Sequence, residues 1–404
     1  MFFGIGIILL PSAFPISCIF LFCALISSIS LNYAKFLDDR LNRVLMVFLT
    51  LLIISNFIFF FNSSNSIISI NKLQGFLGLS NWIPQILCFW FFQQYLSSSD
   101  KRVLFAKYLL IGSIPVIFSF ITQLWFGWYG PYRFFFDLII WFQRETSNYR
   151  LTGLFSNANY SATWLGLILP ISISFYLNKK RNFFLAIFVF FIFYFGLLTG
   201  SRSFILSTLL SIGFVVGIKI LLLISAIGLI IYLLILNNFV DFDMKNELIK
   251  SFTPWRIFST ISDPEINKIT RIEIYQTTLD LIRFKPLWGW GATAFPLLYE
   301  FFESGKKMQH SHNILLEITF NYGIFVTISF LIFLLILIFK TFQLVFFETR
   351  FNSNINKAFF ASSISVLTFQ FTDFTYYEGK ISIISWIILS TLNSIIIESK
   401  EKKF

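Results

Sequence analysis

The stretch HNILLEITFNYGIFVTISFLIFLLILIF, residues 312–339, decides the fold class of this 404-residue chain. Apart from His312 and Glu317, it contains only apolar and small or uncharged residues. Its length exceeds the ~20 residues that an α-helix needs to cross the hydrocarbon core of a bilayer. The stretch therefore predicts a membrane-spanning helix that begins beside the only two histidines of the sequence, His310 and His312.

Similar apolar runs recur along the whole chain. The sequence is 56% hydrophobic and 13% charged, with a mean hydropathy of +0.77, which excludes an ordinary soluble domain. We expect about twelve spanning helices of ~20 residues each, in an all-α polytopic membrane protein whose residues 1–404 form one transmembrane domain. The candidate spans lie near 2–11 (a half-span interrupted by proline), 13–31, 44–61, 82–98, 103–122, 156–177, 183–200, 203–217, 219–236, 312–339, 358–374 and 381–397.

The basic residues predict the orientation, because cytoplasmic loops carry an excess of Lys and Arg. The short loops on one side of the membrane contain only Lys72, Arg202 and Lys380, whereas the loops and the tail on the other side contain sixteen basic residues. Both termini are therefore expected in the cytoplasm, and two longer segments, 123–155 and 237–311, are expected to face outward. The sixteen residues on the cytoplasmic side are Lys35, Arg40, Arg43, Lys101, Arg102, Lys107, Lys179, Lys180, Arg181, Lys219, Lys340, Arg350, Lys357, Lys400, Lys402 and Lys403.

The remaining bulk features exclude several classes of protein. A net charge of +11 would suggest nucleic acid in a soluble protein, but here the charges are scattered through loops. We therefore expect anionic membrane lipids, and no nucleic acid, as partners. The three cysteines all fall in apolar spans, without disulfide or metal-ligand spacing. The N-terminus lacks the basic region of a cleaved signal peptide and is interpreted as the first membrane segment.

The second outward segment contains KITRIEIYQTTLDLIRFKPLWGWG, residues 268–291. Four apolar residues recur there at helical spacing, and Pro286 and Gly289 end the pattern. We expect an amphipathic helix that lies on the membrane surface or packs across the mouth of the bundle. The four apolar residues are Ile272, Tyr275, Leu279 and Ile282.

Arg202 stands in a short turn between two apolar spans, in LLTGSRSFIL, residues 197–206. A guanidinium is costly in hydrocarbon, so it must reach headgroups, water or an anion. It could be a plain interfacial anchor. The small and hydroxyl residues around it, Ser201 among them, instead favour an anion pocket at a helix start.

Two further arginines face outward. Arg271 opens the predicted loop helix and suits an oxyanion, although a surface pair with Glu273 or Asp280 would also explain it. Arg150, in RLTGLFSNANYSATWLGLILP, precedes a polar cluster that leads into a span. Helix capping explains one member of this cluster but not the whole run. The polar cluster consists of Ser156, Asn157 and Asn159.

The His310–His312 pair admits three interpretations. A transition metal would need three or four ligands, and no cysteine lies on this side. His312 precedes Asn313 at a helix start, where the helix dipole disfavours imidazolium, so a neutral general base is a second interpretation. A hydrogen-bonded histidine at the interface is the third. Glu317 lies one turn further, inside the expected bilayer, where a carboxylate is a functional candidate; Asp373 and Glu378 are weaker ones.

Four segments, RLTGLFSNANYSATWLGLILP, LLTGSRSF, TRIEIYQTTLDLIRFKPLWGWG and HSHNILLEITFNYG, together resemble the O-antigen ligase and polymerase superfamily. The resemblance covers about 150–325. It implies a metal-independent, inverting glycosyltransferase of the GT-C type, without a cofactor, at the periplasmic face of the bacterial inner membrane. The donor would be a glycan on undecaprenyl diphosphate. The acceptor would be a hydroxyl of the lipid A core in a ligase, or of another lipid-linked repeat unit in a polymerase.

The resemblance matches three residues to the catalytic positions of that family, namely Arg202, Arg271 and His312. His310 has no firm counterpart. Two guanidiniums can neutralise a diphosphate leaving group, and a neutral histidine can deprotonate the attacking hydroxyl. The expected substrate-binding residues around them are Arg150, Asn157, Asn159, Ser201, Asn313 and Glu317.

Alternative functions follow from the same features. The RLTGLFSNAN and HSHN patterns favour a ligase over a polymerase. A solute or inorganic-carbon transporter is the alternative of another class, but transporters place paired charges at the midplane, whereas these charges cluster at the outer face. The sequence contains no GxxxxGK[ST] or GxSxG motif, which argues against ATP hydrolysis and serine-hydrolase chemistry.

Overall fold

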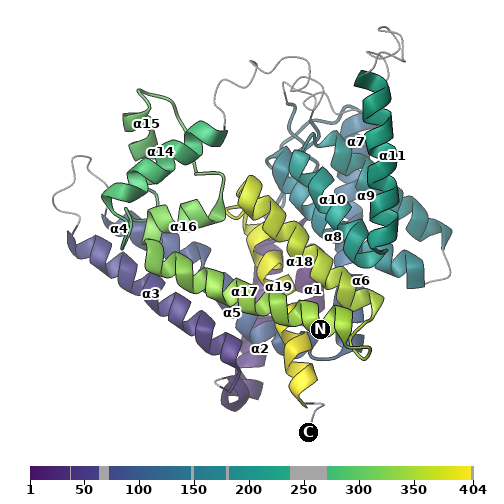
Figure 1. Cartoon of the computed structure of the whole chain (residues 1–404), viewed down its shortest axis with the longest axis horizontal. Coiled ribbons are helices and arrows are strands. Elements are labelled where there is room, and N and C mark those ends of the chain that lie inside the picture. The colour runs from purple at the N-terminus through teal and green to yellow at the C-terminus, as the bar shows by residue number, and fades with distance from the viewer. Residues whose placement is uncertain (37, 63–71, 147–149, 179–181, 237–270, 402–404) are drawn as a thin grey trace. The chain divides into compact units, whose positions relative to one another are not determined.

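The computed structural model describes residues 1–36, 38–62, 72–146, 150–178, 182–236 and 271–401 (Figure 1). The chain divides into two compact units, which are considered separately below. Unit 1 comprises residues 1–23, 99–268 and 348–369, and unit 2 comprises residues 24–98, 269–347 and 370–404. The first part of the loop expected at 237–311, residues 237–270, lies outside the described residues.

The described part of the chain is predominantly helical, as expected. Six of its helical segments are long and apolar enough to cross a membrane, whereas the sequence led us to expect about twelve spans. The six segments are Arg40–Phe61, Gly75–Leu96, Ser99–Trp125, Ala158–Asn178, Ile324–Phe347 and Gly379–Glu401. Four shorter apolar helices, Phe14–Ser28, Phe183–Leu198, Arg202–Val215 and Ile218–Ile227, account for part of the difference.

Unit 1 is organised around α8 (Ala158–Asn178), which is buried along most of its length. Gly166 lets two other helices approach α8, because a Cβ at this position would lie 2.9 Å from both Phe369 and Ser207. The hydroxyls of Ser207 and Ser365 are 2.5 Å apart beside it. The other helices of this unit are α1 (Phe2–Leu9), α6 (Ser99–Gly112), α7 (Ile114–Trp125), α9 (Phe183–Leu198), α10 (Arg202–Val215), α11 (Ile218–Leu236) and most of α18 (Asn354–Thr372).

Unit 2 packs α17 (Ile324–Phe347) along α3 (Arg40–Asn62), and α19 (Gly379–Glu401) against α5 (Ile83–Phe91) and α17. Large aromatic residues fill the space between them, for example Trp82, which stacks on Tyr376 with ring centroids 4.5 Å apart. The remaining elements are α4 (Lys72–Leu77), η2 (Gly78–Asn81), η3 (Phe92–Leu96), α14 (Arg271–Phe284), α15 (Phe295–Phe302) and α16 (Ile314–Tyr322). Helix α2 (Phe14–Phe36) contributes to both units.

The continuous span expected at 312–339 is wrong, because the helix breaks at Gly323. A helix of 9 residues, α16, ends there, and the 24-residue helix α17 begins at Ile324. Gly323 has φ +88°, which favours glycine, and a Cβ at this position would lie 2.0 Å from the carbonyl oxygen of Leu287. Glu317 therefore lies on the short helix α16, separate from the candidate span Ile324–Phe347.

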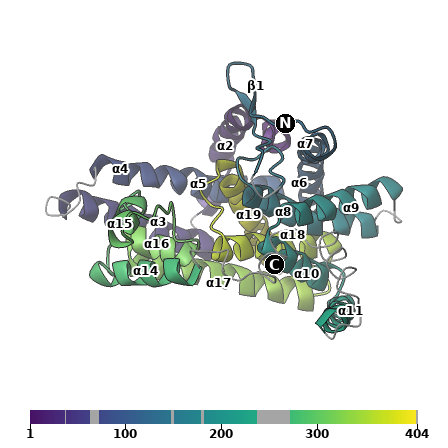
Figure 2. The same cartoon turned by 90° about the horizontal axis from the view of Figure 1, so that it is seen from above.

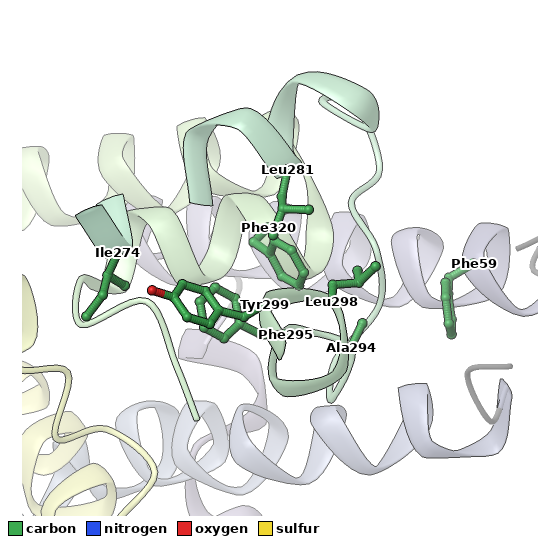
Figure 3. Packing of buried hydrophobic residues seen from close by; sticks show 8 residues of the cluster. All are labelled: Phe59, Ile274, Leu281, Ala294, Phe295, Leu298, Tyr299 and Phe320. Carbon is green, nitrogen blue, oxygen red and sulfur yellow. The ribbon is translucent and has the colours of Figure 1, made fainter. Parts of the chain in front are cut away.

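The loop helix expected from the apolar spacing is confirmed as α14, and it packs on the protein through a different face from the one that the spacing marked. Ile272 and Leu279 are exposed, whereas Ile274, Thr278 and Leu281 are buried. Figure 3 shows that Leu281 lies against Phe320 of α16, in a cluster that also contains residues of α15. Full burial of such an aliphatic side chain contributes roughly 1.5–3 kcal/mol, so this cluster holds α14 on α16.

The segment 123–155, which was expected to face outward, contains a β-hairpin that an all-α prediction does not include. Strand β1 (Tyr132–Phe134) pairs antiparallel with β2 (Ile139–Trp141), with Tyr132 opposite Trp141. Figure 2 shows the hairpin, labelled at β1, projecting beyond α7. Each strand has only three residues, too few for an alternating pattern to be recognised in the sequence.

Candidate active site

The residues expected to carry chemistry fall into two groups. The histidine turn, defined as residues 310–313, belongs to unit 2 together with Arg271. The arginine turn, defined as residues 199–202, belongs to unit 1 together with Arg150. Each group is described within its own unit.

Asn313 is the N-cap of α16, as the sequence indicated. Its side-chain oxygen accepts hydrogen bonds from the backbone N–H groups of Leu315 (2.9 Å) and Leu316 (3.2 Å). Its amide nitrogen donates to the carbonyl oxygen of Phe371 at 3.0 Å. The side chain therefore joins α16 to the last turn of α18, so the geometry supports a capping role rather than the expected substrate contact.

His312 adopts a left-handed backbone conformation, with φ +57°. Few residues other than glycine adopt this conformation, which often marks functional positions. The hydroxyl of Tyr275 donates to the carbonyl oxygen of His312 at 3.4 Å and links the turn to α14. The ring hydrogen-bonds to the backbone of Asp373, while its Nδ1 is buried and has no hydrogen-bond partner among the described residues. Nδ1 is consequently the ring nitrogen that no hydrogen bond from the described residues engages.

Burial is the main reason that the pKa of His312 falls from 6.5 to about 4. The neighbouring His310 and Arg271 also lower it, while the carboxylate of Asp373 raises it. The helix dipole invoked from the sequence points in the same direction, but burial is the larger cause. His312 is therefore a neutral imidazole at pH 7, as a general base must be.

His310 lies against His312, with ring centroids 4.3 Å apart, and its Nδ1 accepts a hydrogen bond from the backbone N–H of His312 at 3.3 Å. Burial lowers the pKa of His310 to about 4 as well. Its ring also packs 5.4 Å from that of Phe374. His310 therefore supports the conformation of the turn. Among the described residues, no group of three or more His, Cys, Asp and Glu side chains could hold a metal ion.

Glu317 is buried and braces the histidine turn from inside. One of its oxygens accepts hydrogen bonds from the backbone N–H and the hydroxyl of Ser311, both at 2.9 Å. The other accepts from the hydroxyl of Tyr377 at 2.7 Å and from the amide of Asn321 at 3.2 Å. Burial raises the pKa of Glu317 and these hydrogen bonds oppose the rise. With both oxygens engaged, the geometry gives no support to the expected substrate contact.

Arg271 forms an ion pair with Asp373, rather than with either of the acidic residues considered from the sequence. Asp280 instead pairs with Arg283 at 2.7 Å. The side chain of Asp373 is 3% exposed and that of Arg271 is 34% exposed, so the guanidinium keeps a face toward solvent. From the sequence, Asp373 was only a weaker functional candidate, because its signal was a single carboxylate just beyond the apolar run that forms α18.

A junction of glycine residues fixes α14 relative to α16. The backbone N–H groups of Trp290 and Gly291 donate to the carbonyls of Phe320 (2.8 Å) and Asn321 (3.0 Å) at the end of α16. Gly289 has φ +71°, and a Cβ there would lie 2.6 Å from the backbone of Asn321. The backbones of the KPLWGWG segment (285–291) and the NYG segment (321–323) therefore contact each other at the end of α16.

Arg150 holds the arginine turn. Its Nε donates to the carbonyl oxygen of Thr199 at 2.6 Å, and its Nη2 donates to the side-chain oxygen of Asn159 at 2.5 Å. Gly200, with φ +63°, leaves room for this guanidinium, which would lie 3.3 Å from a Cβ. Asn157 is exposed, and its side-chain oxygen accepts the backbone N–H of Asn159 at 2.8 Å at the start of α8. Arg150 and both asparagines thus form one local scaffold.

Helix α10 begins at Arg202, whose side chain is exposed. Its N-cap, Ser201, makes no side-chain capping bond. The Ser201 hydroxyl is buried and has no hydrogen-bond partner within the described parts of the chain. The start of α10 therefore offers the donors that suit an anion at a helix start. They are the first backbone N–H groups of the helix, the Ser201 hydroxyl and the Arg202 guanidinium.

These helices define an integral membrane protein with donor groups on short loops and at helix starts. Residues 151–331 match the family model of the O-antigen ligase (Wzy_C), which confirms the resemblance to the O-antigen ligase and polymerase superfamily over this segment. The matched segment contains Arg202, Arg271 and His312, whereas Arg150 and Asp373 lie outside it. A search of curated proteins found no match. The family match gives no support to a transporter.

Proposed function

We propose that this protein transfers a glycan from undecaprenyl diphosphate to an acceptor hydroxyl at the periplasmic face of the bacterial inner membrane, with both termini in the cytoplasm. The match to the O-antigen ligase family supports an enzyme of this general type. The single observation that carries the mechanism is the placement of Arg271 and His312 around Asp373, within hydrogen-bonding distance of one buried residue.

In this proposal His312 is the general base. Its Nδ1 takes the proton of the acceptor hydroxyl as the oxygen attacks the anomeric carbon of the donor sugar. The bond between that carbon and the diphosphate oxygen breaks, and the undecaprenyl diphosphate leaves with the electron pair. One displacement inverts the anomeric configuration. Two observations support this role: the imidazole is neutral at pH 7, and its Nδ1 accepts no hydrogen bond from the described residues.

Arg271 and Arg202 bind the diphosphate in the same proposal. Asp373 holds one side of the Arg271 guanidinium, and the remaining N–H groups are directed to the leaving group. Arg202 and the N–H groups at the start of α10 supply a second set of donors. Arg150 acts on the turn rather than on the substrate. Bringing Arg202 and Arg271 onto one diphosphate is part of the proposal, as are the GT-C assignment and metal independence.

We favour a ligase that transfers to the lipid A core or another surface acceptor. The alternative is a polymerase that uses a second lipid-linked repeat unit. The sequence patterns RLTGLFSNAN and HSHN support the ligase. The surface glycan profile of a deletion strain separates the two: core lipid without any attached chain is expected for a ligase, and core carrying one repeat unit for a polymerase.

Transfer can be tested with the full chain in nanodiscs, supplied with undecaprenyl-diphosphate-linked glycan and core lipid. We expect transfer to persist undiminished in a chelator, because two guanidiniums replace a metal ion at the diphosphate. Transfer that disappears in chelator and returns with a divalent cation would refute metal independence. A preparation that binds the donor but never transfers it, at any acceptor concentration, would refute the glycosyltransferase.

A further inference from the structure

The hairpin of unit 1 exposes an aromatic tip that the proposed reaction does not use. Phe135 is 73% exposed and Phe136 is fully exposed, at the turn between β1 and β2. Phe135, Phe136 and Asp137 all have left-handed backbones, with φ between +50° and +68°. Bulky residues rarely adopt this conformation, and such outliers concentrate at functional positions. The turn therefore exposes two phenyl rings in a backbone conformation that is unfavourable for bulky residues.

The hairpin starts close to one end of a membrane span. The candidate span Ser99–Trp125 ends with α7, and β1 begins at Tyr132. Between them Trp125, Trp128 and Tyr129 are exposed. Trp and Tyr concentrate where the hydrocarbon meets the headgroups, so this connection marks the boundary of the bilayer. Phe135 and Phe136 follow this connection closely in the chain.

The hairpin is firmly attached to the rest of unit 1. The side chain of Gln143, just after β2, is buried and donates to the carbonyl oxygen of Ser119 (2.8 Å) and the hydroxyl of Thr122 (2.7 Å) on α7. The indole N–H of Trp141 donates to the carbonyl oxygen of Ser12 at 3.1 Å. These bonds fix the base of the hairpin, so the tip is presented in a set direction.

The same attachment reaches the arginine turn. The backbone N–H of Gln143 donates to the carbonyl oxygen of Gly153 at 2.8 Å. Gln123 on α7 accepts from the N–H groups of Thr152 and Gly153 at 3.1 and 2.9 Å. Gly153 is three residues from Arg150, which holds the arginine turn. Hairpin, α7 and arginine turn are thus parts of one hydrogen-bonded scaffold.

We propose that Phe135 and Phe136 insert among the lipid chains of the leaflet at the Trp125 end of this span, and that the hairpin thereby sets the depth of the arginine turn. Two features favour lipid over a protein partner. The tip follows a connection that exposes Trp125, Trp128 and Tyr129 at the end of the span, and Arg133, which pairs with Asp137 at 3.2 Å, is 61% exposed, so its guanidinium can also reach a lipid phosphate.

Spin-label accessibility tests this proposal without any assay of transfer. The full chain, with Cys18, Cys23 and Cys88 replaced by alanine and Phe136→Cys carrying a nitroxide, is placed in nanodiscs of phosphatidylethanolamine and phosphatidylglycerol. Accessibility to oxygen, which concentrates in lipid, is compared with accessibility to a water-soluble nickel complex. Phe118→Cys, on an exposed position of α7, is the lipid control, and Glu145→Cys, exposed beyond β2, is the water control.

The label at position 136 is expected to be accessible to oxygen and protected from nickel, like that at position 118. Accessibility to nickel equal to that at position 145 would overturn the proposal. Protection from both reagents would also overturn it, because it would indicate a protein surface. In a second sample labelled at Leu138→Cys, the change Phe135→Ser together with Phe136→Ser should raise nickel accessibility several-fold; no change would likewise count against insertion.

Discussion

The buried carboxylate of Asp373 forms an ion pair with Arg271, and the backbone of the same residue hydrogen-bonds the ring of His312. These residues lie on three separate stretches of the chain. Asp373 immediately follows α18, Arg271 opens α14, and His312 precedes the N-cap of α16. Asp373 thus positions both Arg271, which is proposed to bind the diphosphate, and His312, the proposed base.

We predict that Asp373→Asn lowers kcat about 100-fold, because Arg271 loses the anion that holds it while its own charge remains. The loss of a buried ionic partner should also reduce the free energy of unfolding by about 1–3 kcal/mol. Turnover assays and thermal unfolding in detergent measure both effects. Asp280→Asn is the matched control: it breaks an exposed pair with Arg283, so we expect a change within about 0.5 kcal/mol and normal turnover. Full activity of Asp373→Asn would refute the positioning role.

His312→Ala should lower transfer by about 10²–10⁴-fold, because the acceptor hydroxyl then has no base. His310→Ala should reduce transfer less, because His310 only supports the turn through its contact with the His312 backbone. Single-turnover measurements with saturating donor and acceptor distinguish the two. Equal losses in both variants, with intact donor binding, would argue that neither ring takes the proton.

The histidines also predict a pH dependence. Because the pKa of His312 is about 4 in the folded protein, the base stays neutral and active down to about pH 4, well below the ordinary 6.5. The acid limb of kcat should therefore lie near pH 4 once losses from unfolding are corrected. A limb centred near pH 6.5 in the folded protein would contradict the burial of this ring.

The free energy of unfolding should also depend on pH, because the pKa values of both His310 and His312 are lowered in the folded protein. Between pH 6.5 and about 4 the unfolded histidines bind protons that the folded ones exclude, so the free energy of unfolding rises with pH across this window. As the pH falls through the window, proton binding to the unfolded chain progressively lowers the free energy of unfolding, by up to about 3 kcal/mol for each histidine. Thermal unfolding midpoints of the wild type and of His310→Gln, measured across the window, check this; the variant should show a smaller acid loss.

Gly323→Ala should lower the free energy of unfolding by more than about 2 kcal/mol, since both φ and space exclude a Cβ there. Gly305→Ala is the control. Gly305 has φ +93° but nothing lies within 4 Å of its Cβ position, so only the backbone term of about 1 kcal/mol is expected. Denaturation of both variants isolates the contact with Leu287. Equal losses would show that the α16–α17 junction tolerates a side chain.

Arg202→Lys should reduce kcat/KM by about tenfold or more, because lysine lacks the bidentate fork of arginine. Its unfolding should stay normal, because Arg202 is exposed at the start of α10. Arg150→Lys should instead reduce stability, since the buried side of the arginine turn loses the bonds to Thr199 and Asn159. Wild-type kinetics for Arg202→Lys would identify it as a simple interfacial anchor.

Several local features of the candidate site could be predicted from the sequence. Helix α16 begins directly after Asn313, α14 begins at Arg271, and α10 begins at Arg202, where the patterns indicated helix starts. Each depends on the chemistry of residues within one or two turns, namely caps, glycines and hydrophobic spacing. The family resemblance rests on the same segments, and the O-antigen ligase match covers them.

The pairing of distant residues could not be predicted in this way. Spacing along α14 favoured the face of Ile272 and Leu279, but α15 and α16 bury Ile274 and Leu281. The partner of Arg271 lies 102 residues away, at Asp373, while Glu273 was closer in sequence. Glu317 resembled an intramembrane carboxylate until the break at Gly323 placed it on a separate helix.

By itself, the sequence determined that this is a helical membrane protein, where its site helices begin and which residues carry the O-antigen ligase pattern, because hydropathy and capping act over short distances. Only the tertiary structure decided that Asp373 binds both Arg271 and His312, and that Glu317 holds the histidine turn through Ser311. It also decided that the 312–339 run breaks where Gly323 approaches Leu287. These outcomes depend on packing and hydrogen bonds between segments far apart in the chain, which no local pattern records.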